Sequence, residues 1–186
     1  MRFSRLTPDD LDDAARVLAE RVLQVSADGL GGPFNLMLRS PAMAVRLMAM
    51  LTYFNEDTQV LDPLCRRLAV LALAREAGAA YAWWTHRRRA LARGEFPPAV
   101  IDAINRREVP PGLTAKQAAT LAFAGEIARD GRSSDATHAA LRAEMGEAEV
   151  VELIVLCGTY ATVAMLLAEG EVGLPEGEVD TLIRDR

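Results

Sequence analysis

Residues 68–94 read LAVLALAREAGAAYAWWTHRRRALARG and contain the strongest indications of the fold. Every residue of Leu68–Ala74 is apolar, which predicts a helix buried on most of its circumference rather than an amphipathic surface helix. Gly78 interrupts a helical pattern that would otherwise run over residues 63–93, an unusual length for a small globular protein. We therefore expect one helix to end near Gly78 and a second to begin just after it and end at Gly94.

The second of these helices carries the residues that could do chemistry. It holds both tryptophans, Trp83 and Trp84, and His86, which is one of two histidines. Ala79, Ala82 and His86 fall on one stripe of the helix, and the small side chains leave room in front of the imidazole. The same residues could also be an aromatic core patch, because buried aromatic side chains usually serve packing. The residue types leave both interpretations open.

The rest of the chain also reads as helices. Pairs of an N-cap residue and a proline predict helix starts at Thr7-Pro8, Ser40-Pro41 and Asp62-Pro63. The long apolar run within residues 147–168 is interrupted by Glu152 and by polar residues, which favours a core helix over a membrane span. No sustained period-two alternation or nucleotide-binding glycine motif competes with this pattern. The predicted class is all-α.

Composition and charge fit one cytoplasmic domain. A chain of 186 residues, half hydrophobic and a quarter charged, predicts a single domain over 1–186, with an N-terminal helix and loop over 1–31 and a loose tail over 174–186. The net charge is −5 and no basic block exceeds Arg87–Arg89, so we expect neither nucleic-acid nor membrane partners. The N-terminus turns acidic where a signal peptide would need an apolar stretch, which indicates a cytoplasmic protein.

The two cysteines offer no redox motif. Cys65 and Cys157 lie far apart in the sequence, each within an apolar run, and form no Cys-x-x-Cys pair. This setting predicts two reduced, buried thiols rather than a disulfide. The second histidine, His138, is expected at the surface.

Three segments, in this order and spacing, carry a resemblance to a known family. They are GPFNLMLRSPAMAVRL (32–47), AYAWWTHRRRALARG (80–94) and MGEAEVVELIVLCGTYATVAMLL (145–167). With them the chain resembles the carboxymuconolactone decarboxylase and AhpD alkylhydroperoxidase superfamily over residues 32–175. The resemblance implies an AhpD-like multi-helix bundle that assembles as a homotrimer or hexamer.

The departures from the family pattern bear on chemistry. Peroxidase members carry a Cys-x-x-Cys pair at the start of the second helix, a histidine four residues on, and a proton-relaying glutamate one helix earlier. The cysteine positions correspond here to Ala79 and Ala82, and the glutamate to Arg67, so that His86 alone remains. Because that redox chemistry depends on a thiolate activated by the helix N-terminus, we predict no thiol peroxidase activity. In addition, Thr159 stands where the family has a tyrosine.

The remaining matches imply a candidate site. Tyr81, Trp83, His86 and Tyr160 follow the family pattern. We expect a cofactor-independent lyase or isomerase that acts on a small carboxylated or lactone substrate, with His86 as general acid/base and the three aromatic residues shaping the pocket. Aromatic and arginine neighbours should keep His86 neutral, as a base able to take a proton from a bound acid. A metal site is not expected, because the neighbouring residue types offer no ligands.

A second function class fits the same residues. The chain could be a non-catalytic oligomeric module that kept the fold and lost the chemistry. Glu76 and Glu152 are candidates for the missing acid, although each is more often a charge on a helix surface or at a helix end. A carboxylate within hydrogen-bond reach of His86 would discriminate between the two classes.

Overall fold

The computed structural model describes residues 2–26, 28–55 and 60–184. Within these ranges the chain forms nine α-helices, one 3-10 turn and no strand, which confirms the predicted all-α class. In chain order the elements are η1 (Pro8–Asp10), α1 (Asp13–Val25), α2 (Pro33–Met37), α3 (Pro41–Tyr53), α4 (Pro63–Glu76), α5 (Ala80–Ala92), α6 (Pro98–Arg106), α7 (Ala115–Asp130), α8 (Asp135–Glu144) and α9 (Glu147–Glu169).

Helix α4 is the centre of the larger core. It packs against α5, α6, α7 and α9. Every residue of Leu68–Ala74 is at most 4% exposed, so the predicted burial on most of the helix circumference is confirmed. The Asp62 carboxylate begins the helix by accepting hydrogen bonds from the N–H groups of Leu64 and Cys65, at 3.0 and 2.9 Å. Full burial of each leucine here stabilises the fold by about 1.5–3 kcal/mol.

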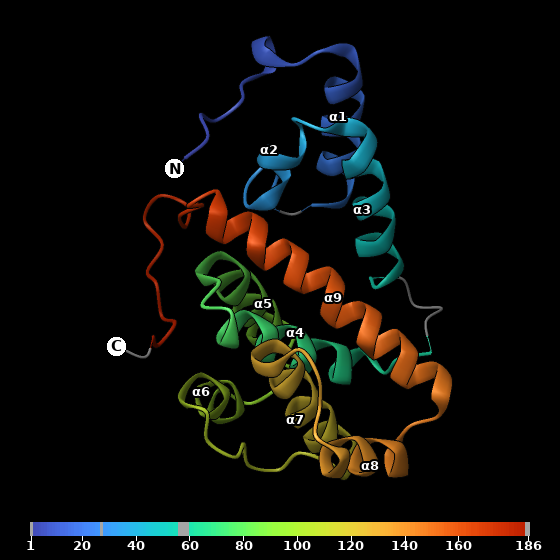
Figure 1. The fold of residues 1–186 in the computed structure, drawn as a ribbon. Helices are drawn as coiled ribbons and strands as arrows, with labels where there is room; N and C mark the ends of the chain where they lie inside the picture. The colour runs from blue at the N-terminus through green and yellow to red at the C-terminus, as the bar shows by residue number, and fades with distance from the viewer. Residues whose placement is uncertain (1, 27, 56–59, 185–186) are drawn as a thin grey trace.

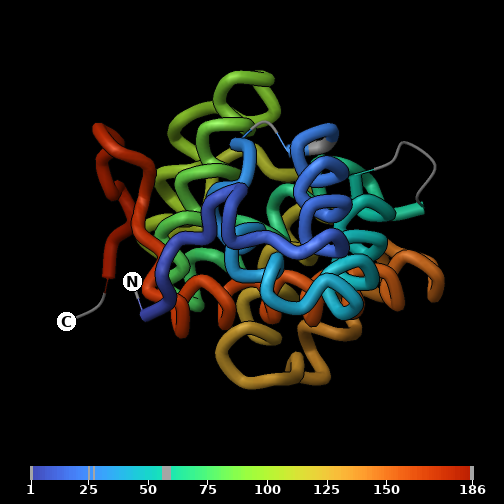
Figure 2. Tube along the Cα trace, turned by 90° about the horizontal axis from the view of Figure 1, so that it is seen from above, coloured from blue at the N-terminus to red at the C-terminus, as the bar shows by residue number. Residues whose placement is uncertain are grey.

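Helix α9 runs diagonally between two groups of helices (Figure 1). Helices α1 to α3 lie on one side of it and α4 to α8 on the other, and Figure 2 shows the same molecule turned by 90°. The smaller of two apolar clusters joins α1, α2 and α3, and the larger one surrounds α4 and also includes Leu51 of α3. The long apolar helix therefore connects the two groups.

Glycines end the two central helices in the same way. Gly78 and Gly94 both have φ of +63°, a left-handed conformation that favours glycine. After Gly94, the N–H of Glu95 donates to the carbonyl of Ala90 at 2.9 Å, as in a Schellman motif. The predicted breaks are confirmed, and the second one folds Glu95 back toward the end of α5.

The sequence predicted a helix starting at Thr7-Pro8, and this prediction is wrong for the first turn. Thr7 and Asp10 hydrogen-bond each other and form the short η1, after which Leu11 is extended. Helix α1 begins only at Asp13, because the Asp12 side chain caps it by accepting from the N–H of Ala15 at 2.8 Å. Two N-cap sequences compete here, and the second one starts the helix.

The tail after Pro175 is not loose over its whole length, which corrects the prediction. It forms no helix or strand through residue 184, yet Leu182 is buried. The Asn105 side chain donates to the Thr181 carbonyl at 2.8 Å and accepts from the Ile183 N–H at 3.0 Å. Residues 181–183 are therefore fastened to the end of α6.

Among the described residues, α9 is the one helix long and apolar enough to cross a membrane by length and composition. Core helices of soluble proteins meet the same two criteria. In its most apolar window 44% of the residues are buried inside the molecule, and its inner face packs on α4. This packing agrees with the core helix that the sequence predicted.

Candidate functional site

His86 lies at the meeting point of three helices. It stands in the middle of α5 and is 8% exposed. Arg67 of α4 places its Nη1 2.6 Å from the imidazole Nδ1. Tyr160 of α9 presents its ring to the imidazole in an edge-on contact, with the ring centroids 5.3 Å apart. The structure thus brings together two residues that the sequence singled out, His86 and Tyr160, with Arg67.

A carboxylate holds Arg67 in place. Glu95 accepts from Arg67 Nε at 2.6 Å and from Nη2 at 3.2 Å, while Nη1 is directed at His86. The side chains of Arg67 and Glu95 are only 11% and 16% exposed, so water screens this ion pair weakly. The three residues form a continuous line, which we call the Glu95–Arg67–His86 chain.

The partner of Nδ1 assigns the tautomer of His86. A guanidinium carries only N–H donors and no acceptor, so Nδ1 must accept from Arg67 through its lone pair. The single proton of the neutral ring therefore sits on Nε2.

Charge and burial keep His86 neutral. Burial lowers the pKa of His86 well below its ordinary value, and the positive charges of Arg67, Arg89 and Arg66 lower the pKa further. The ring is thus uncharged at neutral pH, as the sequence predicted from the aromatic and arginine neighbours.

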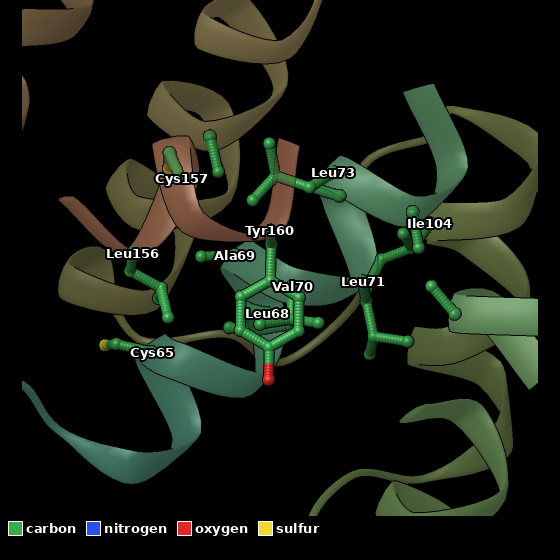
Figure 3. Close-up of a cluster of buried hydrophobic side chains, with 14 of the residues drawn as sticks. Cys65, Leu68, Ala69, Val70, Leu71, Leu73, Ile104, Leu156, Cys157 and Tyr160 are labelled. Atoms are coloured by element: carbon green, nitrogen blue, oxygen red, sulfur yellow. The ribbon is translucent and has the colours of Figure 1, made fainter. Parts of the chain in front are cut away.

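Tyr160 closes the other side of the site. It belongs to the same buried cluster as Leu68, Ala69 and Val70 of α4, and Figure 3 shows its side chain among the labelled members of that cluster. Burial raises the pKa of Tyr160, against the opposing effect of nearby arginines, so the phenol stays protonated at neutral pH.

Tyr81 and Trp83 make their contacts elsewhere. The Tyr81 ring contacts the Trp84 ring at a tilt of 59°, with the centroids 5.5 Å apart, and fills the space beside Gly32, where a Cβ would come within 2.4 Å of the ring. Trp83 is fully buried, and its Nε1 donates to the Thr181 hydroxyl at 3.3 Å. In this chain Tyr81 anchors the loop before α2, and Trp83 anchors the tail.

Neither candidate replacement acid reaches His86. Glu76 pairs with Arg107 at 2.8 Å and with Arg129 at 3.2 Å, where it joins the ends of α4 and α6 to α7. Glu152 accepts from the Tyr53 hydroxyl and from the Leu61 N–H. Glu95 is the carboxylate connected to the imidazole through hydrogen bonds, and the connection is indirect: Glu95 binds Arg67, and Arg67 binds His86.

Sequence reasoning missed Glu95 and Asp28. Glu95 follows the glycine that ends α5, and a residue in that position turns back toward its own helix, a signal that could have identified it. Asp28 pairs with Arg88 and Arg89, the latter at 3.0 Å. The arginine run is therefore partly tied to the N-terminal loop rather than being a fully solvated face.

The thiols and the family's cysteine positions offer no nucleophile beside His86. Ala79 and Ala82 are buried at the start of α5. Cys65 and Cys157 are free and buried, as predicted. Burial raises the pKa of Cys65 to about 11 and that of Cys157 to about 12, so very little thiolate exists at neutral pH.

Two cavities of the molecule lie away from His86. One of about 150 Å³ surrounds Glu76 between α4, α6 and α7, and one of about 330 Å³ lies between Phe3 and the end of α9 at Met165. In the part of the chain that the structure describes, no three His, Cys, Asp or Glu side chains group together as metal ligands would.

Comparison with known proteins identifies the fold. No protein-family model matches the chain, and no curated protein is significantly similar. Among solved structures, the chain is similar to a protein of unknown function from Agrobacterium tumefaciens that is described as a candidate antioxidant defence protein AhpD. The TM-score is 0.67 at 21% identity, over 77% of this chain and 98% of that one. The chain therefore has an AhpD-like all-helical fold.

Proposed function

We propose that this protein is a cofactor-independent lyase that acts on a small carboxylated or lactone substrate, with His86 as the hydrogen-bond donor to the negative charge that develops on the substrate. One observation carries the proposal: the 2.6 Å contact between Arg67 Nη1 and His86 Nδ1 inside a buried site. This contact fixes a neutral imidazole with its proton on Nε2, ready to donate. Arg66, Arg67 and Arg89 give the surroundings a positive potential that favours an anionic substrate.

The fixed tautomer favours a lyase over an isomerase. An isomerisation begins when a base removes a proton from carbon, but Nε2 already carries one and Nδ1 is engaged with Arg67. A decarboxylation needs no such base. His86 therefore does not act first as a base, in contrast to the expectation from the sequence.

The reaction can be written with this chain's own groups. The carbon–carbon bond to the substrate carboxylate breaks, its electron pair moves into a conjugated carbonyl, and carbon dioxide leaves. The Nε2–H of His86 stabilises the resulting enolate oxygen as a hydrogen-bond donor, as a neutral imidazole can. The carbon then takes up a proton that derives ultimately from water, so one proton is consumed for each carbon dioxide released.

This balance defines the test. The purified protein is incubated with a carboxylated muconolactone and with a panel of small β-keto and lactone carboxylic acids. Carbon dioxide release and proton uptake are followed together. The proposal expects turnover of at least one substrate with equal amounts of the two. Absence of carbon dioxide release across the panel would contradict it.

A non-catalytic binding module is the second candidate, and a specific observation favours it. Glu95 reaches His86 only through Arg67, so the carboxylate that would have supported acid/base chemistry makes no direct contact with the imidazole. Such a module would bind small carboxylates without converting them. A carboxylate that raises the thermal midpoint but is recovered intact after prolonged incubation would support this candidate.

We also propose that the chain assembles with copies of itself, as a homotrimer or hexamer. Helix α9 leaves a line of uncharged residues exposed, and α3, which packs on α9, also exposes apolar side chains. The exposed residues are Val151, Ile154, Val155, Gly158, Thr162 and Met165 on α9, with Met43, Val45 and Met50 on α3. We call this surface the α9–α3 face.

The total surface supports the same proposal. The chain exposes 9927 Å², whereas a compact monomer of this mass would expose about 8,800 Å². The excess is comparable with the roughly 800 Å² that each partner buries in a stable interface. We propose that a second copy of the chain covers the uncharged α9–α3 face, through its own α9–α3 face or a neighbouring surface. The trimer or hexamer number follows from the family resemblance.

A further inference from the structure

We infer that Glu95 is a positioning residue for His86 and acts through Arg67. The Glu95–Arg67–His86 chain joins three parts of the fold: the turn after α5, the first half of α4, and the middle of α5. Its contacts are 2.6 Å from Glu95 to Arg67 Nε and 2.6 Å from Arg67 Nη1 to His86 Nδ1. The consequence for catalysis rests on the proposed function, but the arrangement itself does not.

Arg67 needs a counter-charge to remain where it is. Arg66 and Arg89 also act on His86 with positive charge, and the Arg67 side chain is only 11% exposed. A guanidinium in such surroundings is costly to bury without a partner. The Glu95 carboxylate supplies one and engages Nε and Nη2, which fixes the plane of the guanidinium and leaves Nη1 for the imidazole.

Glu95 is itself held by the backbone. Gly94 adopts φ of +63°, and the Glu95 N–H donates to the Ala90 carbonyl at 2.9 Å. Arg93 also approaches the Glu95 carboxylate, but at 3.8 Å and with its side chain 67% exposed, so it contributes little. The helix end, rather than the neighbouring arginine, sets the position of the carboxylate.

The role of Glu95 is therefore to hold the tautomer of His86. With Arg67 fixed, Nδ1 accepts and Nε2 carries the proton. With Arg67 displaced, the ring is free to carry its proton on Nδ1 and to offer a lone pair at Nε2, which would turn the donor of the proposed reaction into an acceptor.

Nitrogen-15 NMR of histidine-labelled protein tests this inference directly. The His138→Gln background leaves His86 as the single histidine, so one pair of imidazole signals reports the tautomer ratio. The parent should show Nε2–H almost exclusively. Glu95→Gln and Arg67→Met should each lower the ratio of Nε2–H to Nδ1–H about tenfold or more, as expected on loss of a charged hydrogen bond. Arg93→Gln is the matched control and should leave the ratio unchanged.

Three results would overturn the inference. They are a parent spectrum dominated by Nδ1–H, a Glu95→Gln ratio equal to that of the parent, or an Arg93→Gln effect as large as that of Glu95→Gln. The parent measurement needs only the substitution of the exposed His138, and Glu95→Gln keeps the shape of the side chain. Because the spectra require no turnover, they test the role of Glu95 even if the proposed lyase activity is not found.

Discussion

At the scale of single residues, the buried neutral His86 has a consequence for stability. Its folded pKa is lowered by burial and by Arg67, whereas the unfolded chain has a histidine of ordinary pKa, about 6.5. Above that pH both states are neutral and the group leaves stability unchanged. As the pH falls below about 6.5, the unfolded state takes up the proton first, so the free energy of unfolding decreases until the pH reaches the folded pKa.

Urea unfolding between pH 7.5 and 5 measures this effect. We predict that the wild-type protein loses up to about 1.4 kcal/mol per pH unit through His86, and that His86→Gln removes this part of the pH dependence. His138→Gln, which replaces an exposed histidine, is the control and should keep the wild-type slope. Equal slopes for wild type and His86→Gln would mean that His86 is not held neutral.

The buried cysteines lead to a second prediction at this scale. Because burial raises the pKa of Cys65 to about 11 and of Cys157 to about 12, both should react slowly with thiol reagents at pH 7 in the folded state. We predict no thiol-dependent reduction of an organic hydroperoxide, measured by peroxide consumption with a dithiol reductant. Robust turnover that disappears in Cys65→Ser or Cys157→Ser would show this prediction to be wrong.

At the scale of helices and turns, the two glycine breaks provide a matched pair. Gly78 and Gly94 share φ of +63°, and a Cβ on either would meet no atom within 4 Å. Alanine at either position should therefore destabilise the fold by a similar amount, about 1–2 kcal/mol from backbone strain. Because Gly94 precedes Glu95, Gly94→Ala alone should also disturb the His86 tautomer. Chemical unfolding and the histidine spectra measure the two effects, and a disturbance of equal size in Gly78→Ala would contradict the assigned role of the α5 end.

Elements of this fold differ in how well sequence predicts them. Helix α4 was predictable because Leu68–Ala74 is apolar throughout and Asp62-Pro63 marks its start. Both signals depend only on residues that are close together in the sequence. The Arg67–Glu95 pair was not, because it joins side chains 28 positions apart and depends on how α4 packs beside α5. The docking of residues 181–183 was hidden for the same reason, since Asn105 pairs with them across 76 or more positions.

The same distinction applies to the candidate site. The stripe on α5 identified His86, and the family pattern added Tyr160, which lies against the imidazole. Tyr81 and Trp83 share a helix with His86, but Tyr81 contacts Trp84 and the loop at Gly32, and Trp83 contacts Thr181 of the tail. A sequence pattern can place such residues on one helix without showing which surface each contacts.

At the scale of the whole molecule, the α9–α3 face predicts self-association. A charge in the middle of an uncharged interface carries a desolvation cost, so Ile154→Lys together with Met165→Glu should dissociate the oligomer. Val109→Glu is a matched control, because Val109 is 94% exposed and lies in the loop before α7. Light scattering at micromolar protein should give a trimer or hexamer mass for wild type and Val109→Glu, and a smaller mass for the double variant. A monomer mass for the wild type would refute self-association.

The proposed function depends on His86, held neutral by Arg67 and Glu95, donating a hydrogen bond to the enolate that forms in a decarboxylation. The most direct measurement is kcat/KM for carbon dioxide release by wild type and His86→Gln, with both proteins shown to have the same assembly mass. We expect a loss of about 10²- to 10³-fold in His86→Gln, as on removal of one donor to a developing oxyanion, and little change in His138→Gln. Unchanged kcat/KM in His86→Gln would contradict the claim.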